Sequence, residues 1–172
     1  MAMDFTVIQA VRQRFGDSNV IDAAQISESE FPLEQEAPFA GQSKDYQFSC
    51  PNVDSTQMAI LQFESLSVTA GGQFPFTPQF SGKRNIVRIN GLDIPGGITN
   101  APYVKAVDRT WHFWKTHSLL VPPVLKEEGN ILHIEAIRIP ISGGTTFDNF
   151  IIDNVVVLFK LRAGGGLHQQ AL

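Results

Sequence analysis

Residues 111–137 read WHFWKTHSLLVPPVLKEEGNILHIEAI and hold both tryptophans and three of the four histidines of the 172-residue chain. An apolar run here ends in Pro122 and Pro123, which suit a strand edge or entry because proline cannot donate to a β-ladder. The Glu-Glu-Gly-Asn segment that follows predicts a turn. In it, Gly129 suits a positive φ and Asn130 can bond nearby backbone groups.

Strict alternation of apolar and polar side chains follows this turn. Leu132, Ile134 and Ala136 lie on one side of an extended chain, whereas His133 and Glu135 lie on the other. The alternation predicts a β-strand that turns one face toward a core and the other toward solvent.

The same signals recur along the chain. Residues 84–97 read RNIVRINGLDIPGG, in which the Asn-Gly pair predicts a hairpin turn. Residues 56–70 alternate, and residues 150–161 are apolar on both faces, as in a central strand. Short strands separated by glycine and proline turns, with no helix expected after residue 15, predict an all-β antiparallel β-sandwich.

The N-terminal region shows a different pattern. Within residues 5–15, Val7, Ile8, Val11 and Phe15 are spaced as on one face of a helix, which predicts a short amphipathic helix. We therefore expect the chain to enter the sandwich through a short helical segment.

Residues 17–36 carry six acidic side chains and no basic one. This segment is either a solvated acidic connector or an arm that docks on a neighbouring subunit. The expected division of the chain is an N-terminal arm at 1–43, the sandwich at 44–162 and a flexible glycine-rich tail at 163–172. If the arm is separable, removal of residues 1–40 should leave a folded sandwich.

Composition excludes several classes of protein. A hydrophobic content of 43% and a charged content of 17% are typical of a globular chain. The net charge of −4 argues against nucleic-acid binding, and no apolar run approaches the ~20 residues of a membrane span. A single cysteine, Cys50, excludes an intrachain disulfide and a multi-cysteine metal site. The N-terminal stretch lacks the features of a secretory signal, so we expect synthesis in the cytoplasm.

The stretch at 111–137, with its Val-Pro entry and Gly-Asn turn, resembles the galactose-binding-like jelly rolls. These modules accompany many glycoside hydrolases and lyases and also occur as free carbohydrate-binding domains. The segments NIVRINGLDIP and FDNFIIDNVVVLFK are similar to the middle and last strands of that family. The resemblance covers roughly residues 55–160. It implies a jelly-roll fold, glycan binding, and a structural calcium ion between the first and last strands.

Aromatic side chains at 111–114 are the best candidates for a glycan site, because sugar rings stack on indole faces beside polar groups that bind the hydroxyls. We expect Trp111 in the core and Trp114 exposed, although the stretch is alternatively a packed corner of the sandwich. The expected ligand-binding residues are Trp114, His112, His117 and Arg109. A zinc site is disfavoured, because residues 112 and 117 would point to opposite faces of a continuous strand.

Asp153 and Asn154 interrupt an otherwise apolar strand. One of them faces inward unless a bulge intervenes, and a buried carboxylate needs hydrogen bonds or a cation. The resemblance suggests that this cation is a structural calcium ion that touches Asp153. The alternatives are a cap on a neighbouring loop or a pair with an arginine such as Arg138.

No catalytic constellation is recognisable. Glu127 and Glu128 are adjacent in a turn, whereas a glycosidase pair must face across a cleft. The chain has no Gly-x-Ser-x-Gly elbow and no phosphate-binding loop, and Cys50 has no recognisable partner. We therefore expect a non-enzymatic carbohydrate-binding module without a cofactor other than the possible calcium ion. The alternative is a structural or assembly protein, such as a decoration or tail component of a phage-like particle, and in either case a homo-oligomer.

Overall fold

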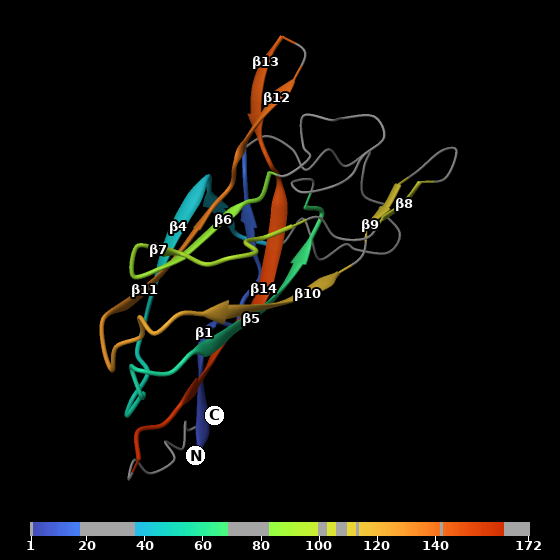
Figure 1. Ribbon diagram of the computed structural model, residues 1–172. Helices are drawn as coiled ribbons and strands as arrows, with labels where there is room; N and C mark the ends of the chain where they lie inside the picture. The colour runs from blue at the N-terminus through green and yellow to red at the C-terminus, as the bar shows by residue number, and fades with distance from the viewer. Residues whose placement is uncertain are drawn as a thin grey trace.

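A computed structural model describes residues 2–17, 37–68, 83–99, 103–105, 110–112, 114–141 and 143–163. These residues form β-strands and no helix, and the strands make two main, mostly antiparallel sheets (Figure 1). The predicted all-β architecture is therefore confirmed. Residues 18–36, which include most of the acidic segment, and residues 164–172 of the tail lie outside the described residues.

The first sheet has the strand order β10-β5-β14-β2-β3, and β1 also pairs with β14. The second sheet has the order β4-β11-β6-β7, and two hairpins, β8–β9 and β12–β13, complete the described strands. The bounds in the first sheet are β1 (Met3–Gln9), β2 (Gln13–Phe15), β3 (Phe39–Gly41), β5 (Ala59–Leu66), β10 (Lys115–Val121) and β14 (Phe150–Lys160). The other bounds are β4 (Ser43–Phe48), β6 (Ile86–Ile89), β7 (Leu92–Asp93), β8 (Tyr103–Lys105), β9 (Thr110–His112), β11 (Asn130–Glu135), β12 (Arg138–Ile141) and β13 (Gly144–Phe147).

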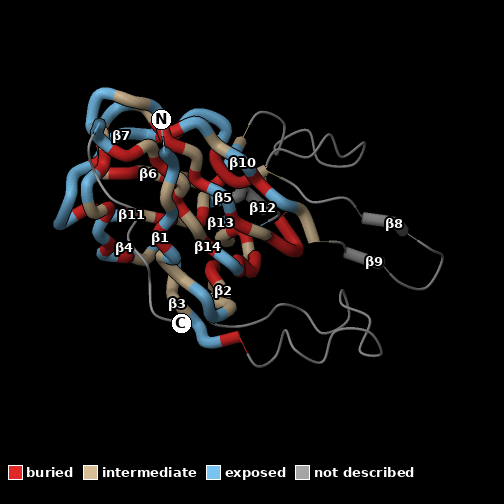
Figure 2. Tube along the Cα trace, turned by 90° about the horizontal axis from the view of Figure 1, so that it is seen from below, coloured by how far each residue is buried: buried red, intermediate tan, exposed pale blue. Residues whose placement is uncertain are grey.

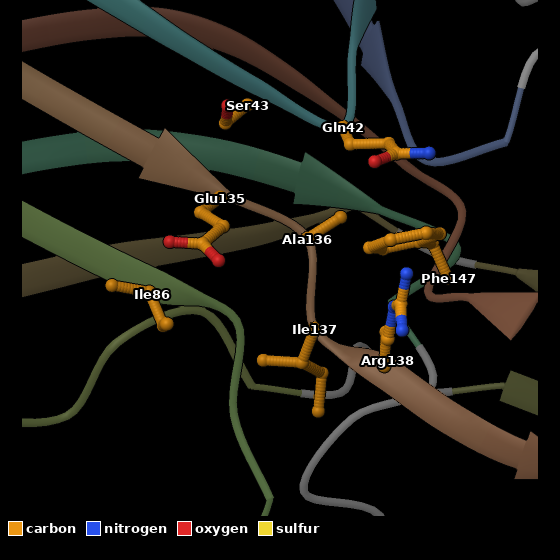
Figure 3. A pocket seen from close by; sticks show the side chains of 8 residues that line it. All are labelled: Gln42, Ser43, Ile86, Glu135, Ala136, Ile137, Arg138 and Phe147. Carbon is orange, nitrogen blue, oxygen red and sulfur yellow. The ribbon is translucent and has the colours of Figure 1, made fainter. Parts of the chain in front are cut away.

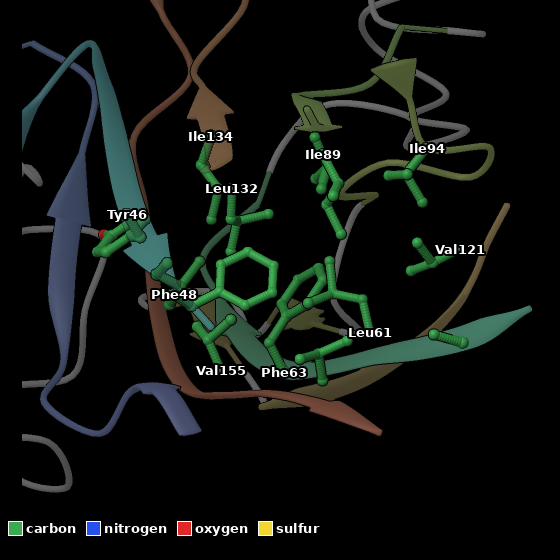
Figure 4. Packing of buried hydrophobic residues seen from close by; sticks show 14 of the residues in the cluster. Tyr46, Phe48, Leu61, Phe63, Ile89, Ile94, Val121, Leu132, Ile134 and Val155 are labelled. Atoms are coloured by element: carbon green, nitrogen blue, oxygen red, sulfur yellow. The ribbon is translucent and has the colours of Figure 1, made fainter. Parts of the chain in front are cut away.

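The core lies between the two sheets, where alternate residues of both meet (Figures 2 and 4). Leu132 and Ile134 of β11 are fully buried, whereas His133 and Glu135 lie on the outer side, as the alternation predicts. From the first sheet, Phe63 of β5 projects into the same core. This alternation follows from the two-residue period of a strand, which points successive side chains to opposite faces of its sheet.

The predicted N-terminal helix is wrong, because residues 3–9 and 13–15 form strands β1 and β2. The two strands lie end to end along β14, from the pair Met3 and Lys160 to the pair Phe15 and Phe150. β-Branched residues such as Val7 and Ile8 suit a strand at least as well as a helix, and β14 supplies the pairing partner. The structure therefore does not divide the chain at residue 44, and removing residues 1–40 would strip one edge from β14.

A bulge interrupts β14 at Asp153 and Asn154. Asn154 has a φ of 52°, and the pairing with β5 shifts register between Asp153 and Val156. Before the bulge Ile152 faces the core, and after it Val155 does, so the bulge moves the core side by one residue. The bulge thus accommodates the two polar residues in the apolar strand, and it is one of the two alternatives that the sequence allowed.

The turns predicted from the sequence are confirmed. Asn90 and Gly91 both have positive φ, at 52° and 82°, and join β6 to β7. Gly129 has a φ of 67°, and the Oδ1 atom of Asn130 accepts a hydrogen bond from the Lys126 backbone at 2.8 Å. The Nδ2 atom of Asn90 also donates to Oδ1 of Asn130 at 3.0 Å, so the two turns hold each other in place.

Candidate functional site

The outer face of the second sheet carries a connected array of charged side chains. His133 of β11 lies in register with Asp45 on β4 and with Arg88 on β6. Its Nδ1 and Nε2 atoms lie 2.6 Å from Asp45 Oδ1 and 3.3 Å from Glu135 Oε2. Arg88 contacts Glu135 at 3.4 Å and Asp93 at 2.7 Å. Because these pairs are partly exposed, each contributes little stability, but together they fix the directions of the side chains.

A pocket of about 410 Å³ opens at the end of this array, where β11 continues into the β12–β13 hairpin (Figure 3). Its lining mixes apolar and polar side chains from four parts of the chain. The lining residues are Gln42, Ser43, Ile86, Glu135, Ala136, Ile137, Arg138 and Phe147. This volume falls within the range of roughly 300–1,000 Å³ typical of small-molecule sites.

The wall that the hairpin contributes is held by contacts at its base. The guanidinium carbon of Arg138 lies 5.3 Å from the centre of the Phe147 ring. Asp17 accepts hydrogen bonds through Oδ2 from the Thr146 hydroxyl at 2.6 Å and from the Phe147 backbone N–H at 3.0 Å. The hydrogen bond from Thr146, which has the larger effect, and the one from Phe147 hold the pKa of the Asp17 carboxyl below its usual value. The base of the hairpin is therefore fixed without a ligand.

The pocket combines apolar surface with one carboxylate and one guanidinium. Ile86 and Ile137 offer apolar surface, and Phe147 adds to it, although the Arg138 guanidinium already lies over one face of that ring. Glu135 can accept hydrogen bonds from hydroxyl groups, and Arg138 can donate to them. Convergent polar groups on an apolar wall are the usual design of small-ligand sites.

Trp114 does not stand free as the sequence predicts, but is partly buried on the outer side of the first sheet. Its ring packs against a small cluster of Ala37, Leu66 and Ile151. The Arg12 guanidinium carbon lies 5.1 Å from the ring centre on top of this packing. Trp114 is therefore mainly a structural cover, which leaves little of the ring for a sugar to stack on.

His117 lies inside the sandwich, only 5% exposed. Its ring stacks on Phe63 with centroids 4.7 Å apart, and its Nε2 atom bonds the Ser65 hydroxyl at 2.8 Å. Burial, and then the charge of Lys115, lowers the pKa of His117 to about 4. At neutral pH the ring is thus an uncharged part of the core and is not accessible to a ligand.

Of the two other predicted ligand residues, His112 and Arg109, the structure describes only the backbone of His112. The backbone of His112 pairs with that of Tyr103 in the β8–β9 hairpin, where Trp111 pairs with Val104. Arg109 lies outside the described residues, as do the side chains of residues 110–112. The predicted core position of the Trp111 side chain therefore also lies outside the described residues and stays a prediction.

Asp153 is 8% exposed and pairs with an arginine, although with Arg12 and not with Arg138. Its Oδ2 atom accepts from Arg12 Nε at 2.8 Å, and its Oδ1 atom accepts from the Asn154 backbone at 2.9 Å. In the part of the chain that the structure describes, no group of three or more His, Cys, Asp or Glu side chains could hold a metal ion. The cation that the structure places beside the Asp153 carboxylate is the Arg12 guanidinium, and a calcium ion there stays a prediction.

The groups considered for catalysis are also placed. Glu127 lies at the surface and pairs with Arg162 at 2.8 Å. Cys50 is fully buried, and burial raises the pKa of its thiol to about 12, so it stays protonated at neutral pH. Neither residue lies in the pocket.

Sequence reasoning missed the pocket as a site, although it predicted parts of the frame. Glu135 was expected on the outer face of its strand, but the β12–β13 hairpin that follows, Arg138–Ile141 and Gly144–Phe147, was not expected as the wall of a site. That hairpin carries Arg138 and Phe147 to the end of β11, where β4 and β6 add further lining. No local pattern marks such a site, because its residues come together only when the sheet forms.

Comparison with profiles of known protein families, with curated proteins and with solved structures found no match. Within the described ranges, no helix is long and apolar enough to cross a membrane.

Proposed function

We propose that this chain is a non-enzymatic jelly-roll module that binds a carbohydrate in the pocket between β11 and the β12–β13 hairpin. The observation that carries the proposal is the composition of the pocket wall. An aromatic ring, a carboxylate and a guanidinium converge there, from Phe147, Glu135 and Arg138. The site differs from the one expected at 112–117, since His117 and much of Trp114 are packed away.

The order of the strands supports the jelly-roll assignment. Along the chain, the strands pass from one sheet to the other in turn: β1 and β2, β4, β5, β6 and β7, β10, β11, and finally β14. The resulting orders are β10-β5-β14-β1/β2 and β4-β11-β6-β7. They contain eight strands when β1 and β2 count as one interrupted strand and the three-residue edge strand β3, which pairs with β2, is set aside. Eight strands in two facing sheets are what a jelly roll requires, and this architecture is common among lectins and capsid proteins.

The test is a glycan array followed by titration calorimetry with the sugars that bind. Phe147→Ala and Arg138→Gln should each weaken binding by about fivefold or more, since losing an aromatic contact or a hydrogen bond to a charged group costs roughly 1–3 kcal/mol. Arg162→Gln is the matched control, because Arg162 is an exposed arginine that pairs with Glu127 and does not line the pocket. A silent array, or binding that survives both pocket substitutions, contradicts the proposal.

The alternative function is a structural or assembly role, such as that of a decoration or tail component of a phage-like particle. A specific observation favours it: the outer face of the first sheet exposes large apolar side chains, among them Phe5 and Leu120. Exposed apolar patches of this kind commonly mark protein–protein contacts. The two roles are compatible, because the pocket and this face belong to different sheets.

A further inference from the structure

The outer face of the first sheet carries an apolar row that crosses four neighbouring strands. The pairing registers place Phe5 opposite Leu158, Leu158 opposite Ile60, and Ile60 opposite Leu120. The row therefore runs without interruption from β1 over β14 and β5 to β10, which lie side by side (Figure 1). At its two ends, Phe5 is 48% exposed and Leu120 is 59% exposed.

Neighbouring positions widen this row into an apolar band. Val7 and Val156 pair with each other one row further along β14, and the polar residues Gln62 and Ser118 continue that row on β5 and β10. Met3 and Met58 add exposed apolar surface beside the row of Phe5. We define the apolar band as Met3, Phe5, Val7, Met58, Ile60, Leu120, Val156 and Leu158. An antiparallel sheet with one face in solvent normally carries polar residues there, as the second sheet does with His133 and Arg88. The contrast between the two outer faces indicates that the outer face of the first sheet contacts another protein surface.

The charges beside the band point to the identity of the partner. Lys160 lies in register with Met3, one row beyond the row of Phe5 and Leu158. Glu64 lies in register with Thr116, beyond the row of Val156. A basic group thus stands at one end of the band and an acidic group at the other. A surface with this arrangement complements itself when it is turned by a two-fold rotation.

We propose that two copies of this chain associate face to face through the apolar band, about a two-fold axis that runs across the strands. The axis passes between the Leu158 row and the Val156 row, so each of these rows covers the other one in the second copy. The same rotation brings the row of Lys160 in each copy over the row of Glu64 in the other. Such an isologous contact is the commonest form of homo-oligomer, and two sheets packed in this way bury their facing side chains.

This inference is independent of the proposed glycan site, and it adds a consequence for that site. The pocket is built on the second sheet, so a contact through the first sheet leaves both pockets of the dimer open. Two linked sites bind a multivalent glycan more tightly than one, because the second binding event is intramolecular.

The experiment is sedimentation velocity of the full chain over a series of concentrations. The wild-type chain should be a dimer, and Leu120→Lys and Ile60→Lys should each weaken dimerisation by about 100-fold or more, since each dimer carries the substitution twice. Ile131→Lys is the matched control, because Ile131 is a 40% exposed isoleucine on the outer face of the second sheet. This variant should remain a dimer.

Charge exchange gives a second, independent arm of the experiment. Lys160→Glu and Glu64→Lys should each weaken the dimer, and the double exchange should restore it, whereas loss of folding alone would not be restored in this way. Circular dichroism establishes whether each variant is folded. If a lysine variant is not folded, the milder Leu120→Ser variant is measured in its place. A monomeric wild-type chain, a dimer that persists in the folded Leu120 and Ile60 variants, or equal dissociation of the Ile131 variant overturns the proposal.

Discussion

His117 shows that the type of a residue alone does not reveal whether its side chain is a ligand or part of the core. A histidine near tryptophans suggests a ligand site, yet its position on the core side of β10 makes it a neutral, stacked ring. The alternation of β10 places it there, because Val121 four residues later faces the same core. The ring nitrogen is satisfied by Ser65, a residue that no local pattern connects to it.

The lowered pKa of His117 predicts a pH dependence of stability. The pKa is about 4 in the folded chain and near 6.5 when unfolded, so the unfolded state binds more protons below pH 6.5. The stability is therefore fully present above pH 6.5 and is lost as the pH falls toward 4, by roughly 2–3 kcal/mol. Denaturant unfolding at pH 7 and pH 4.5 measures this loss, and His117→Gln is the control that should lack it. Equal losses in the two proteins would show that His117 is accessible to protons in the fold.

Trp114 yields a stability prediction that differs from what an exposed side chain, expected from the sequence, would give. A free stacking platform could be removed without effect on melting, but this ring covers Leu66 and Ile151 beneath Arg12. Because it is only partly buried, Trp114→Ala should cost about 1.5–3 kcal/mol, less than the roughly 3–5 kcal/mol of a fully buried aromatic residue. Thermal unfolding of Trp114→Ala, with Trp114→Phe as the milder control, gives the answer. An unchanged melting temperature would show that the Trp114 ring does not stabilise the fold, as expected of an exposed side chain.

At the scale of elements, the bulge in β14 and the break between β1 and β2 belong together. The break at residues 10–12 lies along the same edge of β14 as the bulge at Asp153 and Asn154, and Arg12 reaches across to the Asp153 carboxylate. Each irregularity thus fits the other. The salt bridge compensates for the burial of the carboxylate in an apolar strand.

This pairing predicts that Arg12→Ala lowers the free energy of unfolding, because its partner Asp153 is buried. Removing the guanidinium leaves the mostly buried Asp153 carboxylate without its cation, which should lower the free energy of unfolding by about 1–3 kcal/mol. Arg162→Ala, which breaks the exposed pair with Glu127, should cost less than about 1 kcal/mol. Adding Asp153→Asn to Arg12→Ala should recover part of the loss. Equal effects of the two arginine substitutions in chemical denaturation would contradict the compensating role of Arg12.

Strands were predictable where pattern and turn agreed. The alternation in 130–135 and the Asn90-Gly91 and Gly129-Asn130 turns each specify local backbone geometry, and all three are found in the structure. The N-terminal segment was not predictable in this way, because its apolar spacing fits either a helix or a strand. The choice depends on β14, which lies more than a hundred residues away in the sequence and offers an open edge.

At the scale of the whole molecule, the two outer faces of the sandwich divide the proposed roles. The second sheet presents charged side chains and ends in the pocket, whereas the first sheet presents the apolar band. The outward direction of His133 and Glu135 could be predicted from alternation, but neither face as a whole could be, since each is assembled by strand register from residues far apart along the chain. Cross-strand neighbours appear only once the order β10-β5-β14 and the order β4-β11-β6 are known.

The central claim, that this sandwich binds a sugar through the pocket and not through the tryptophan region, is tested most directly by NMR. Backbone amide shifts are followed as a sugar identified on the array is added to the labelled chain. Shifts should concentrate at Glu135, Arg138 and Phe147, while the amides of Trp114 and His117 stay unchanged. Saturable shifts at Trp114 and His117 with a silent pocket, or no shifts with any sugar of the array, would contradict the account.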